Sequence, residues 1–404
     1  MTQEEKKASI DEIFARGTIV EILPSEELFR KRLLEEKLKF YIGFDATSST
    51  LHLSHAKNIM LLEKFRRLGH EVILLFGDFT AMIGDPTGGS LKRKQLTKEE
   101  VKENVESWKK QIIPLMDFET EENPPCIRYN SDWLSQLRFD EVIGLASNFT
   151  VQQMLERDMF EKRMQKGDPV FLHEFLYPLM QGYDSVVLDV DVELCGTDQI
   201  FNALSGRTLL KKCKNKEKFV VAVTLMEDPQ TGELMSKSKG TGVFLNADSR
   251  NMFGQIMSQG DGMIEILFKH CTAVSLKEIS EIMEKENFRD AKLRLAQEIV
   301  KIFYGLEIAE KEKEYFIETF SKKHINAESL DILAVASGSA LMDILVSHKF
   351  AESKSDARRK IEQGGVSLGE EKCLFVERKI ELSDNGEILR IGKKHFVRLN
   401  VSKE

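Results

Sequence analysis

Long apolar runs and paired cysteines are both missing from this chain of 404 residues. No segment approaches the roughly 18 consecutive apolar residues that a membrane-spanning helix needs. The N-terminal sequence MTQEEKK has neither an apolar core nor a cleavage site, so we expect no secretory signal. The five cysteines are scattered, and no two form a Cys-x-x-Cys pair. This pattern disfavours a disulfide framework and a thiolate zinc site, and it predicts a cytoplasmic protein without a protein-bound metal.

A strong excess of positive charge is also absent, which argues against extensive contact with nucleic acid. The net charge is −8, with 42% hydrophobic and 31% charged residues, as in soluble globular proteins. The charge is uneven, because residues 339–404 carry 13 basic and 11 acidic residues, or +2, and the remainder carries −10. A mildly basic C-terminal segment is compatible with a local RNA contact. The length predicts two or three domains.

Two short apolar segments flank an amphipathic helical pattern in the first hundred residues. Residues 39–45 and 71–77 have the composition of buried strands, and apolar residues recur near the helical period between them. Strand, helix and strand at this spacing predict a parallel α/β sheet. In such a sheet ligands bind beyond the carboxyl ends of the strands, where loops 43–52 and 78–90 are expected to lie.

The rest of the chain divides into segments of different character. Further strands are predicted at Ser185–Leu194 and Phe219–Met226. Helical segments are predicted over 1–38, with a helix start at Pro24-Ser25-Glu26-Glu27, over 98–115, over an insertion at 118–180, and over 248–325. Small residues dominate 326–338, a candidate linker, and 339–404 form a short α+β module with helices near 341–349 and 353–363.

Two histidines stand where the first strand-to-helix turn is expected. In His52-Leu53-Ser54-His55 the imidazoles are three residues apart and would share one helix face. Free backbone N–H groups and the helix dipole favour an anion at that end, and imidazoles add donors. We interpret the pair as a phosphate-binding element. Two ordinary surface histidines are the alternative, and a zinc pair is disfavoured because no carboxylate or thiol follows at ligand spacing.

A lysine-bearing loop follows later in the chain, at Met235-Ser236-Lys237-Ser238-Lys239-Gly240. Such a small, polar loop can close over phosphates and neutralise them with an ammonium group. For this segment alone, a flexible surface loop is the alternative interpretation. The Gly-x4-Gly-Lys-Ser/Thr motif is absent, and Gly240-Thr241-Gly242 lacks the third glycine of a dinucleotide fingerprint. A P-loop or dinucleotide-binding fold is therefore disfavoured.

Together the two motifs resemble the His-x-Gly-His and Lys-Met-Ser-Lys-Ser elements of class I aminoacyl-tRNA synthetases. Four further segments resemble the tyrosyl family of that class, of bacterial type, in its order and spacing: Tyr41 to Thr47, Gly84 to Gly88, Tyr177 to Asp184, and Gly196 to Gln199. The final 65 or so residues resemble a small RNA-binding domain shared with a ribosomal protein, most specifically at Ser355 to Ile361 and Gly364-Gly365-Val366.

The resemblance implies a domain plan: a Rossmann-like catalytic domain over 1–247, a helical anticodon-arm domain over 248–325, the linker, and the RNA-binding domain over 339–404. It also implies an activity. Tyrosine is activated with ATP to tyrosyl-adenylate and pyrophosphate, and the tyrosyl group passes to the 3′ end of tRNA(Tyr). Mg²⁺ is expected to enter with ATP and not through a dedicated protein site.

Residue roles also follow from the resemblance. Tyr41 and Asp184 are expected at the phenol hydroxyl, one as donor and one as acceptor. Binding of the tyrosyl group and its ammonium is expected from Asp85, Tyr177, Gln181 and Gln199. Binding of ATP is expected from Gly43, Asp45, Thr47, His52, Ser54, His55, Gly196, Asp198, Met235, Ser236, Lys237 and Ser238. Among these, the catalytic contacts to the phosphates are expected from Thr47, His52, His55 and Lys237. Taken singly, Tyr41 has the alternative of a core aromatic and Asp184 that of an exposed helix carboxylate.

Three positions depart from the family pattern. Ser54 replaces a glycine beside the adenine, Leu234 replaces a lysine of the second motif, and Gly89 stands where many relatives place a lysine. All three changes concern ATP, and they motivate the alternative of a synthetase-like RNA-binding protein with reduced or lost activation. A nucleotidyltransferase and a tryptophanyl enzyme are further alternatives. The C-terminal module disfavours the former and the pair Tyr41 and Asp184 disfavours the latter.

Contacts with tRNA are expected from basic residues of the C-terminal module, namely Lys354, Arg358, Arg359, Lys360, Lys393 and Lys394. Each is equally a candidate for an ordinary solvated charge. A homodimer, formed through the insertion at 118–180, is implied by the resemblance alone.

Overall fold

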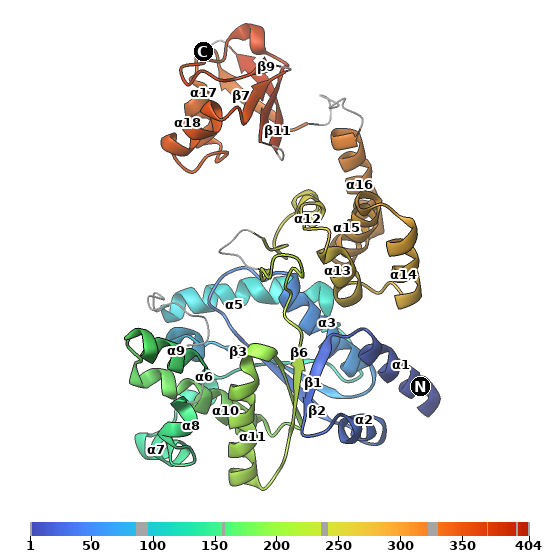
Figure 1. The fold of residues 1–404 in the computed structure, drawn as a ribbon, viewed down its shortest axis with the longest axis vertical. Helices are drawn as coiled ribbons and strands as arrows, with labels where there is room; N and C mark the ends of the chain where they lie inside the picture. Colours follow the sequence, from blue (N-terminus) through green and yellow to red (C-terminus); the bar gives the residue numbers. More distant parts are fainter. Residues whose placement is uncertain are drawn as a thin grey trace. The chain divides into compact units, whose positions relative to one another are not determined.

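The computed structural model describes residues 2–85, 96–155, 158–235, 241–321, 330–369, 371–392 and 395–402 (Figure 1). The chain forms two compact units, Met1–Glu310 and Lys311–Glu404. Each unit has its own sheet. Among the described residues, no helix is long and apolar enough to cross a membrane.

The first unit is built on a six-stranded sheet in the order β1-β6-β5-β2-β3-β4. The pairs β6-β5, β5-β2, β2-β3 and β3-β4 are parallel, and β1 is antiparallel to β6 at one edge. The predicted parallel α/β sheet is thus confirmed. The strands are β1 (Ile19–Leu23), β2 (Lys39–Asp45), β3 (Glu71–Gly77), β4 (Cys126–Tyr129), β5 (Val192–Gly196) and β6 (Phe219–Val223).

The helical crossovers on the two sides of the central strand β2 run in opposite directions along the sheet, and this determines where a ligand crevice can form. Helix α3 (Leu53–Arg67) leads from β2 to β3, whereas β5, on the other side of β2, leads through α11 (Ile200–Lys214) to β6. Right-handed crossovers therefore put α3 and α11 on opposite faces of the sheet. Such a switch point opens a crevice at the carboxyl ends of β2 and β5.

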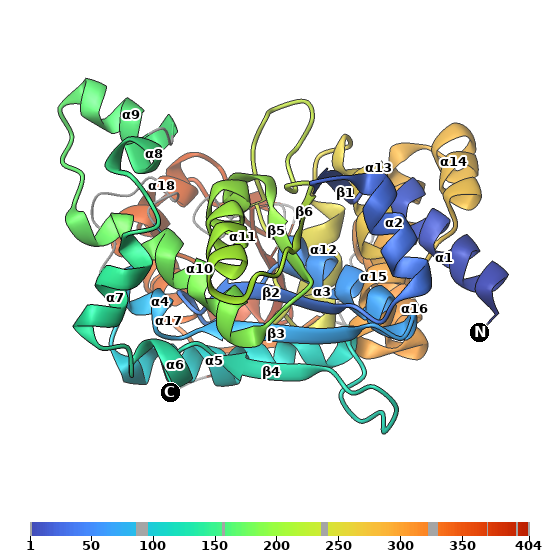
Figure 2. The same ribbon diagram turned by 90° about the horizontal axis from the view of Figure 1, so that it is seen from below.

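Helices pack on both faces because the strands between them are almost entirely apolar. Residues 72–77 of β3 are all buried, as expected for a parallel strand covered on both sides. The ring of Phe40 in β2 stacks on that of Phe65 in α3 with 4.6 Å between centroids. Figure 2 shows α10 (Tyr177–Leu188) beside α11.

Three sequence expectations need correction here. Residues 1–38 contain the strand β1 as well as helices, and the segment 118–180 contains β4, the edge strand of the sheet. In the predicted strand Ser185–Leu194, the chain stays helical as far as Leu188, and only 192–194 are strand. The alternating pattern of 185–194 suggested a strand, but Val186 continues the buried face of a helix that began at Tyr177. Asp189, with φ of 52°, ends that helix.

The other helices of this unit surround the sheet or extend from it. Arg16, at the end of α1, is buried and donates to the carbonyl oxygens of Lys269, Thr272 and Val274, which fixes α13 against the N-terminal helix. The helices are α1 (Gln3–Ala15), α2 (Glu26–Glu35), α4 (Thr80–Ile83), α5 (Lys98–Ile112), η2 (Ile113–Leu115), α6 (Ser131–Leu134), α7 (Phe139–Ala146), α8 (Val151–Leu155), α9 (Asp158–Lys166), η3 (Leu172–Phe175), η4 (Thr197–Gln199), α12 (Ser249–Met257), α13 (Met263–Cys271), α14 (Leu276–Lys285), α15 (Phe288–Tyr304) and α16 (Leu306–Ser321), which runs past the unit boundary.

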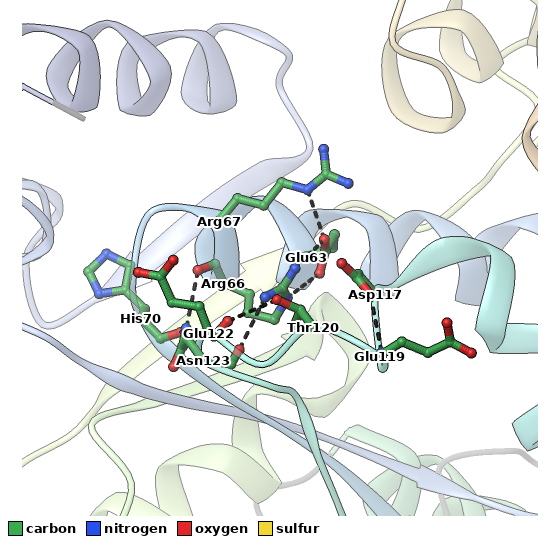
Figure 3. A network of polar contacts seen from close by, with 9 residues as sticks. All are labelled: Glu63, Arg66, Arg67, His70, Asp117, Glu119, Thr120, Glu122 and Asn123. Atoms are coloured by element: carbon green, nitrogen blue, oxygen red, sulfur yellow. Dashed lines mark hydrogen bonds and ion pairs between the residues drawn. The ribbon is translucent and has the colours of Figure 1, made fainter.

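A polar network closes the amino end of the sheet, opposite the crevice (Figure 3). Glu63, only 5% exposed, accepts two hydrogen bonds from Arg66, at 2.6 and 2.9 Å, and one from Arg67 at 2.8 Å. Arg66 also donates to the carbonyl oxygen of Asn123, whose side chain donates to the carbonyl oxygen of His70 at 2.7 Å. These bonds tie α3 to the loop before β4.

The second unit is a five-stranded sheet in the order β7-β11-β10-β8-β9, with two helices against it. Its core gathers apolar residues from both layers, including Leu341, Ile361 and Leu389. Strand β7 lies inside the segment 326–338 that we expected as linker, and it pairs with β11. The elements are β7 (Ile332–Ala336), α17 (Leu341–Ser347), α18 (Lys354–Glu362), β8 (Val366–Leu368), β9 (Glu371–Lys372), η6 (Leu382–Asp384), β10 (Ile388–Ile391) and β11 (His395–Ser402).

Candidate active site

A cavity of about 310 Å³ lies at the carboxyl end of the sheet, at the switch point between β2 and β5. The two strands pair only at Phe40↔Val192 and Tyr41↔Glu193, whereas β2 pairs with β3 along its whole length. Beyond Tyr41 they therefore separate. The predicted site residues that line the cavity are Gly43, Asp45, Thr47, Ser54, His55, Asp85, Tyr177, Gln181, Asp184, Gly196, Asp198 and Gln199.

Asp184 lies deep in this cavity and is only 3% exposed. Its carboxylate accepts a hydrogen bond from the indole N–H of Trp133 at 2.8 Å and one from the amide of Asn130 at 3.3 Å. Burial raises the pKa of Asp184 well above its usual range, and the two hydrogen bonds oppose that rise. Among the described residues that line the cavity, no lysine or arginine is available to pair with this carboxyl group. A hydroxyl group from a ligand would fit it as a further polar partner.

Tyr41 does not line the cavity, although its hydroxyl lies directly beneath the floor. The ring packs with Ile73, Leu75, Leu188 and Val190, and the side chain is 1% exposed. Its hydroxyl is 2.9 Å from Oγ of Ser185, the residue after Asp184. This burial matches the alternative interpretation of Tyr41 as a core aromatic. For the hydroxyl to act on a ligand, the ring would have to shift, or Asp184 would have to lie between the two.

Carboxylates dominate the upper part of the cavity. Asp45 accepts from Thr80 and from the hydroxyl of Tyr177, both at 2.7 Å. The amide of Gln199 donates to Asp85 at 2.6 Å. Burial, with the charges of Asp45 and Asp85, raises the pKa of Tyr177. Among the described lining residues there is no lysine or arginine, so the cavity favours a cationic group of a ligand.

The histidine pair begins helix α3, as the sequence predicted. His52 is the residue before the helix, and its backbone N–H donates to Nδ1 of His55 at 3.3 Å. That bond leaves the proton of a neutral His55 ring on Nε2. Burial lowers the pKa of His52 to about 4 and that of His55 to about 3. At neutral pH these rings carry no charge, and of the two only His55 lines the cavity.

The described residues on either side of the lysine-bearing segment form backbone hydrogen bonds. Met235 is buried, does not line the cavity, and donates its backbone N–H to Met226 at 2.7 Å. On the other side, the backbone N–H of Leu53 donates to the carbonyl oxygen of Val243 at 3.0 Å. The predicted residues Ser236, Lys237 and Ser238 lie outside the described residues, as does Gly89.

Several lining residues were missed by the sequence reasoning. Trp108 lines the cavity and donates its indole N–H to Ser48 at 2.6 Å. Asn58 lines it from α3, three residues after His55, so helical spacing could have identified it. Glu193 and Cys195 line it from β5, and nothing in their local sequence indicated this.

The predicted RNA-binding residues of α18 differ in their surroundings. Lys354 pairs with Asp343 at 2.8 Å, and Asp356 accepts from both Arg359 and Lys360, at 2.6 and 2.7 Å. Arg358 is exposed, and within the described part of the second unit it forms no ion pair. Lys393 and Lys394 lie outside the described residues.

Comparisons with known proteins cover both units. The family model "tRNA synthetases class I (W and Y)" matches residues 33–321, and the model "Tyrosine--tRNA ligase SYY-like C-terminal domain" matches 325–399. A tyrosine-tRNA ligase of Thermotoga maritima is 38% identical over 95% of this chain and 96% of its own length. One of Aquifex aeolicus is 38% identical over 99% of each.

Solved structures share the fold at lower identity. The C-terminally truncated mitochondrial tyrosyl-tRNA synthetase of Aspergillus nidulans has a TM-score of 0.67 at 24% identity, and covers 79% of this chain and 97% of its own. The tryptophanyl-tRNA synthetase of Plasmodium falciparum has a TM-score of 0.57 at 13% identity, and covers 78% of this chain and 89% of its own.

Proposed function

Because this chain belongs to the tyrosine-tRNA ligase family of class I tRNA synthetases, and so joins tyrosine to tRNA with ATP, we propose how its cavity divides that work. The chain activates tyrosine to tyrosyl-adenylate and then transfers the tyrosyl group. The division of roles among the residues rests on one observation: a single cavity combines the buried carboxyl group of Asp184 with the further carboxylates of Asp45, Asp85 and Asp198.

The phenol of tyrosine is bound at Asp184. The carboxyl group already holds Trp133 and Asn130, so a substrate hydroxyl completes its hydrogen bonding. Phenylalanine would leave the buried group without that partner, which is the physical basis of discrimination. Tyr41 supports this end from beneath, through Ser185.

The ammonium of tyrosine is bound near Asp85, Tyr177 and Gln181, where the cavity is acidic. The adenylate lies across Gly43 toward Asp198. An added Cβ at Gly43 would meet no protein atom nearer than Cδ2 of Leu75, at 3.9 Å, so packing does not require glycine there. The free space suits a ligand that approaches the backbone.

The reaction needs alignment and not a protein nucleophile. The carboxylate of tyrosine attacks the α-phosphorus of ATP, the bond to pyrophosphate breaks, and tyrosyl-adenylate forms. His55 and the first turn of α3 donate hydrogen bonds to the phosphates, with Thr47 beside them. Neutral imidazoles cannot balance the triphosphate charge, so Mg²⁺ enters with ATP as part of the substrate, and Lys237 is assigned to the pyrophosphate.

Tyrosine-dependent exchange of label between pyrophosphate and ATP tests this assignment. Exchange with tyrosine, and not with tryptophan or phenylalanine, is the expected result. Exchange with tryptophan alone would indicate the other specificity of the family. Absence of exchange with retained tRNA binding would indicate a synthetase-like RNA-binding protein.

A homodimer is proposed through the segment 118–180. The support is a set of large apolar side chains left exposed there: Phe139 at 79%, Ile143 at 54%, Val151 at 67%, Phe171 at 50% and Leu172 at 79%. Isolated exposed apolar residues are ordinary, but this many within one segment is typical of an interface. Sedimentation of the full chain and of Phe139→Asp, at decreasing concentration, tests it: only the parent should remain dimeric.

The tRNA is proposed to contact the second unit, with Arg358 as its main cation on α18. The other three described cations of that helix are engaged by Asp343 and Asp356. We expect the chain to act in the cytoplasm, in keeping with its five free thiols.

A further inference from the structure

A buried lysine forms an ion pair with a buried glutamate that lines the cavity. Lys218, immediately before β6, is 1% exposed, and Glu193, in β5, is 2% exposed. The ammonium of Lys218 contacts Oε2 of Glu193 and donates to Oγ of Ser185 at 2.6 Å. A buried pair of this kind is expensive to desolvate and is weak evidence for stability by itself. A role other than stability therefore has to be considered.

The helices leave space for this ammonium at one crossing. Gly182 of α10 faces Gly206 of α11, and a Cβ on Gly182 would lie 3.2 Å from the Cα of Gly206. A Cβ on Gly206 would lie 2.6 Å from Nζ of Lys218 and 2.8 Å from Oγ of Ser185. The Lys218 side chain thus occupies room that only glycine leaves open.

The pair fixes the orientation of an amide in the cavity. Glu193 as a carboxylate can only accept hydrogen bonds, and its Oε1 accepts from Nε2 of Gln181 at 2.9 Å. The amide nitrogen of Gln181 is therefore committed to Glu193. Its carbonyl oxygen is left as the end that can meet a ligand, and an oxygen is an acceptor for an ammonium group.

The position of this carboxylate depends on its cation. The ammonium of Lys218 holds Oε2 of Glu193 and is itself bonded to Ser185, which leaves Oε1 facing Gln181. Without Lys218 the carboxylate loses this anchor, and the amide of Gln181 could turn its NH₂ group toward the cavity. Two donors would then face each other, because the ammonium of tyrosine also donates.

We propose that Lys218 is a positioning residue for substrate recognition: by pairing with Glu193 it turns the carbonyl oxygen of Gln181 toward the ammonium of tyrosine. This inference rests on the proposed tyrosine site. It assigns a specific function to a side chain that touches neither the cavity nor the substrate, since Lys218 does not line the cavity.

Binding of two ligands to Lys218→Met separates this role from a structural one. L-Tyrosine carries the ammonium, whereas 3-(4-hydroxyphenyl)propionate has the same ring and carboxylate without it. Both tryptophans of the chain report on the site, because Trp108 lines the cavity and Trp133 bonds Asp184. Intrinsic fluorescence can therefore follow each titration.

The expected result is selective. The Kd of tyrosine should rise by about tenfold or more in Lys218→Met, and the Kd of the propionate should stay within about twofold. The KM for ATP should also be unchanged. The matched control is Lys212→Met, the same substitution on the exposed surface of α11, which should bind both ligands like the parent.

A second variant covers the case in which Lys218→Met fails to fold. Lys218→Met with Glu193→Gln removes both buried charges, so the chain should fold and melt near the parent temperature. Glutamine at 193 can donate or accept, and it no longer dictates the orientation of Gln181. Tyrosine binding should remain weakened in this double variant while binding of the propionate is retained.

Three results would overturn the inference. Equal losses for both ligands would indicate a structural effect on the whole cavity, and unchanged tyrosine binding would show that Lys218 has no role. Full recovery of tyrosine binding in the double variant would show that only the unpaired charge mattered. If the parent itself neither binds tyrosine nor exchanges pyrophosphate with it, the proposed function fails first, and the inference fails with it.

Discussion

Two buried carboxyl groups at opposite ends of the central sheet, Glu63 and Asp184, have opposite kinds of partner. At the amino end, Glu63 receives three hydrogen bonds from Arg66 and Arg67, so its charge is balanced within the protein (Figure 3). At the carboxyl end, Asp184 receives hydrogen bonds only from the neutral groups of Trp133 and Asn130. The protein's own side chains satisfy the first group, and we propose that the hydroxyl of tyrosine completes the second.

This contrast shows how one sheet separates stability from function. Strands β2, β3 and β4 start beside the self-contained network, which ties them to α3. Past Tyr41, β2 and β5 separate, and side chains there face a cavity instead of each other. Changes at the amino end should therefore alter folding, and changes at the carboxyl end should alter tyrosine binding.

The largest effect is expected at Glu63. Removing this carboxylate in Glu63→Ala leaves two guanidinium groups without their partner, one of them buried, and should lower the free energy of unfolding by about 3–5 kcal/mol. Denaturant titration of the first unit measures that change. The KM for tyrosine in the folded fraction should stay near that of the parent. A raised KM for tyrosine at an unchanged free energy of unfolding would show that Glu63 serves substrate binding and not stability.

Acid should next weaken the amino end through His70. This ring is fully buried, and its Nδ1 accepts from the backbone N–H of Leu38 at 3.2 Å. Burial lowers its pKa to about 4 from an ordinary value near 6.5. Between these values the unfolded chain binds more protons, so stability is complete above pH 6.5 and falls as the pH drops toward 4, by about 3 kcal/mol for this group.

The variant His70→Asn isolates that contribution, because asparagine keeps an acceptor but does not titrate. Its free energy of unfolding should depend less steeply on pH between 6.5 and 4 than that of the parent. Equal slopes would show that His70 does not set the acid sensitivity.

A change at the carboxyl end should affect activity more than stability. Asp184→Asn keeps the shape of the side chain but replaces one acceptor oxygen with an NH₂ group, so kcat/KM for tyrosine should fall by about 100-fold. The melting temperature should fall less than in Glu63→Ala, because only one neutral N–H group, of Trp133 or Asn130, loses its acceptor and no cation loses a partner. Asp140→Asn, on the exposed surface of α7, is the matched control. Parent-like tyrosine activation in Asp184→Asn would contradict the phenol assignment.

The sequence predicts some strands of this protein well, and it predicts the contacts of individual side chains less well. The apolar runs 39–45 and 71–77 coincide with β2 and β3, because such runs have few structural options when both faces are covered. The run 185–194 misled, since its alternation fits a strand while its first residues complete helix α10. Long-range packing determines that residues 185–188 are helical, and the local sequence pattern carries no information about that packing.

The residues that line the cavity could be predicted in part, and their electrostatic surroundings could not. Motif resemblance gathered Asp85, Gln181 and Asp184, which do line one cavity. It could not reveal that Lys218 reaches Glu193, because that contact depends on how closely α10 and α11 cross. It also gave no sign that burial makes the paired imidazoles neutral.

The smallest effect is expected at Arg358 in the second unit. Arg358→Glu should raise the KM for tRNA by about five- to tenfold and reduce the salt dependence of binding, while pyrophosphate exchange stays unchanged. Arg359→Glu, whose parent side chain is already engaged by Asp356, should have a weaker effect. Loss of exchange in Arg358→Glu would show that the second unit acts on activation.

A crystal structure of the chain with L-tyrosine tests most directly whether the carboxyl end of the sheet is completed by substrate. The phenol oxygen should lie about 2.7 Å from a carboxylate oxygen of Asp184, with the ammonium near Asp85 and the carbonyl oxygen of Gln181. Tyrosine bound with its ammonium at Asp184, or bound outside this cavity, would contradict the account.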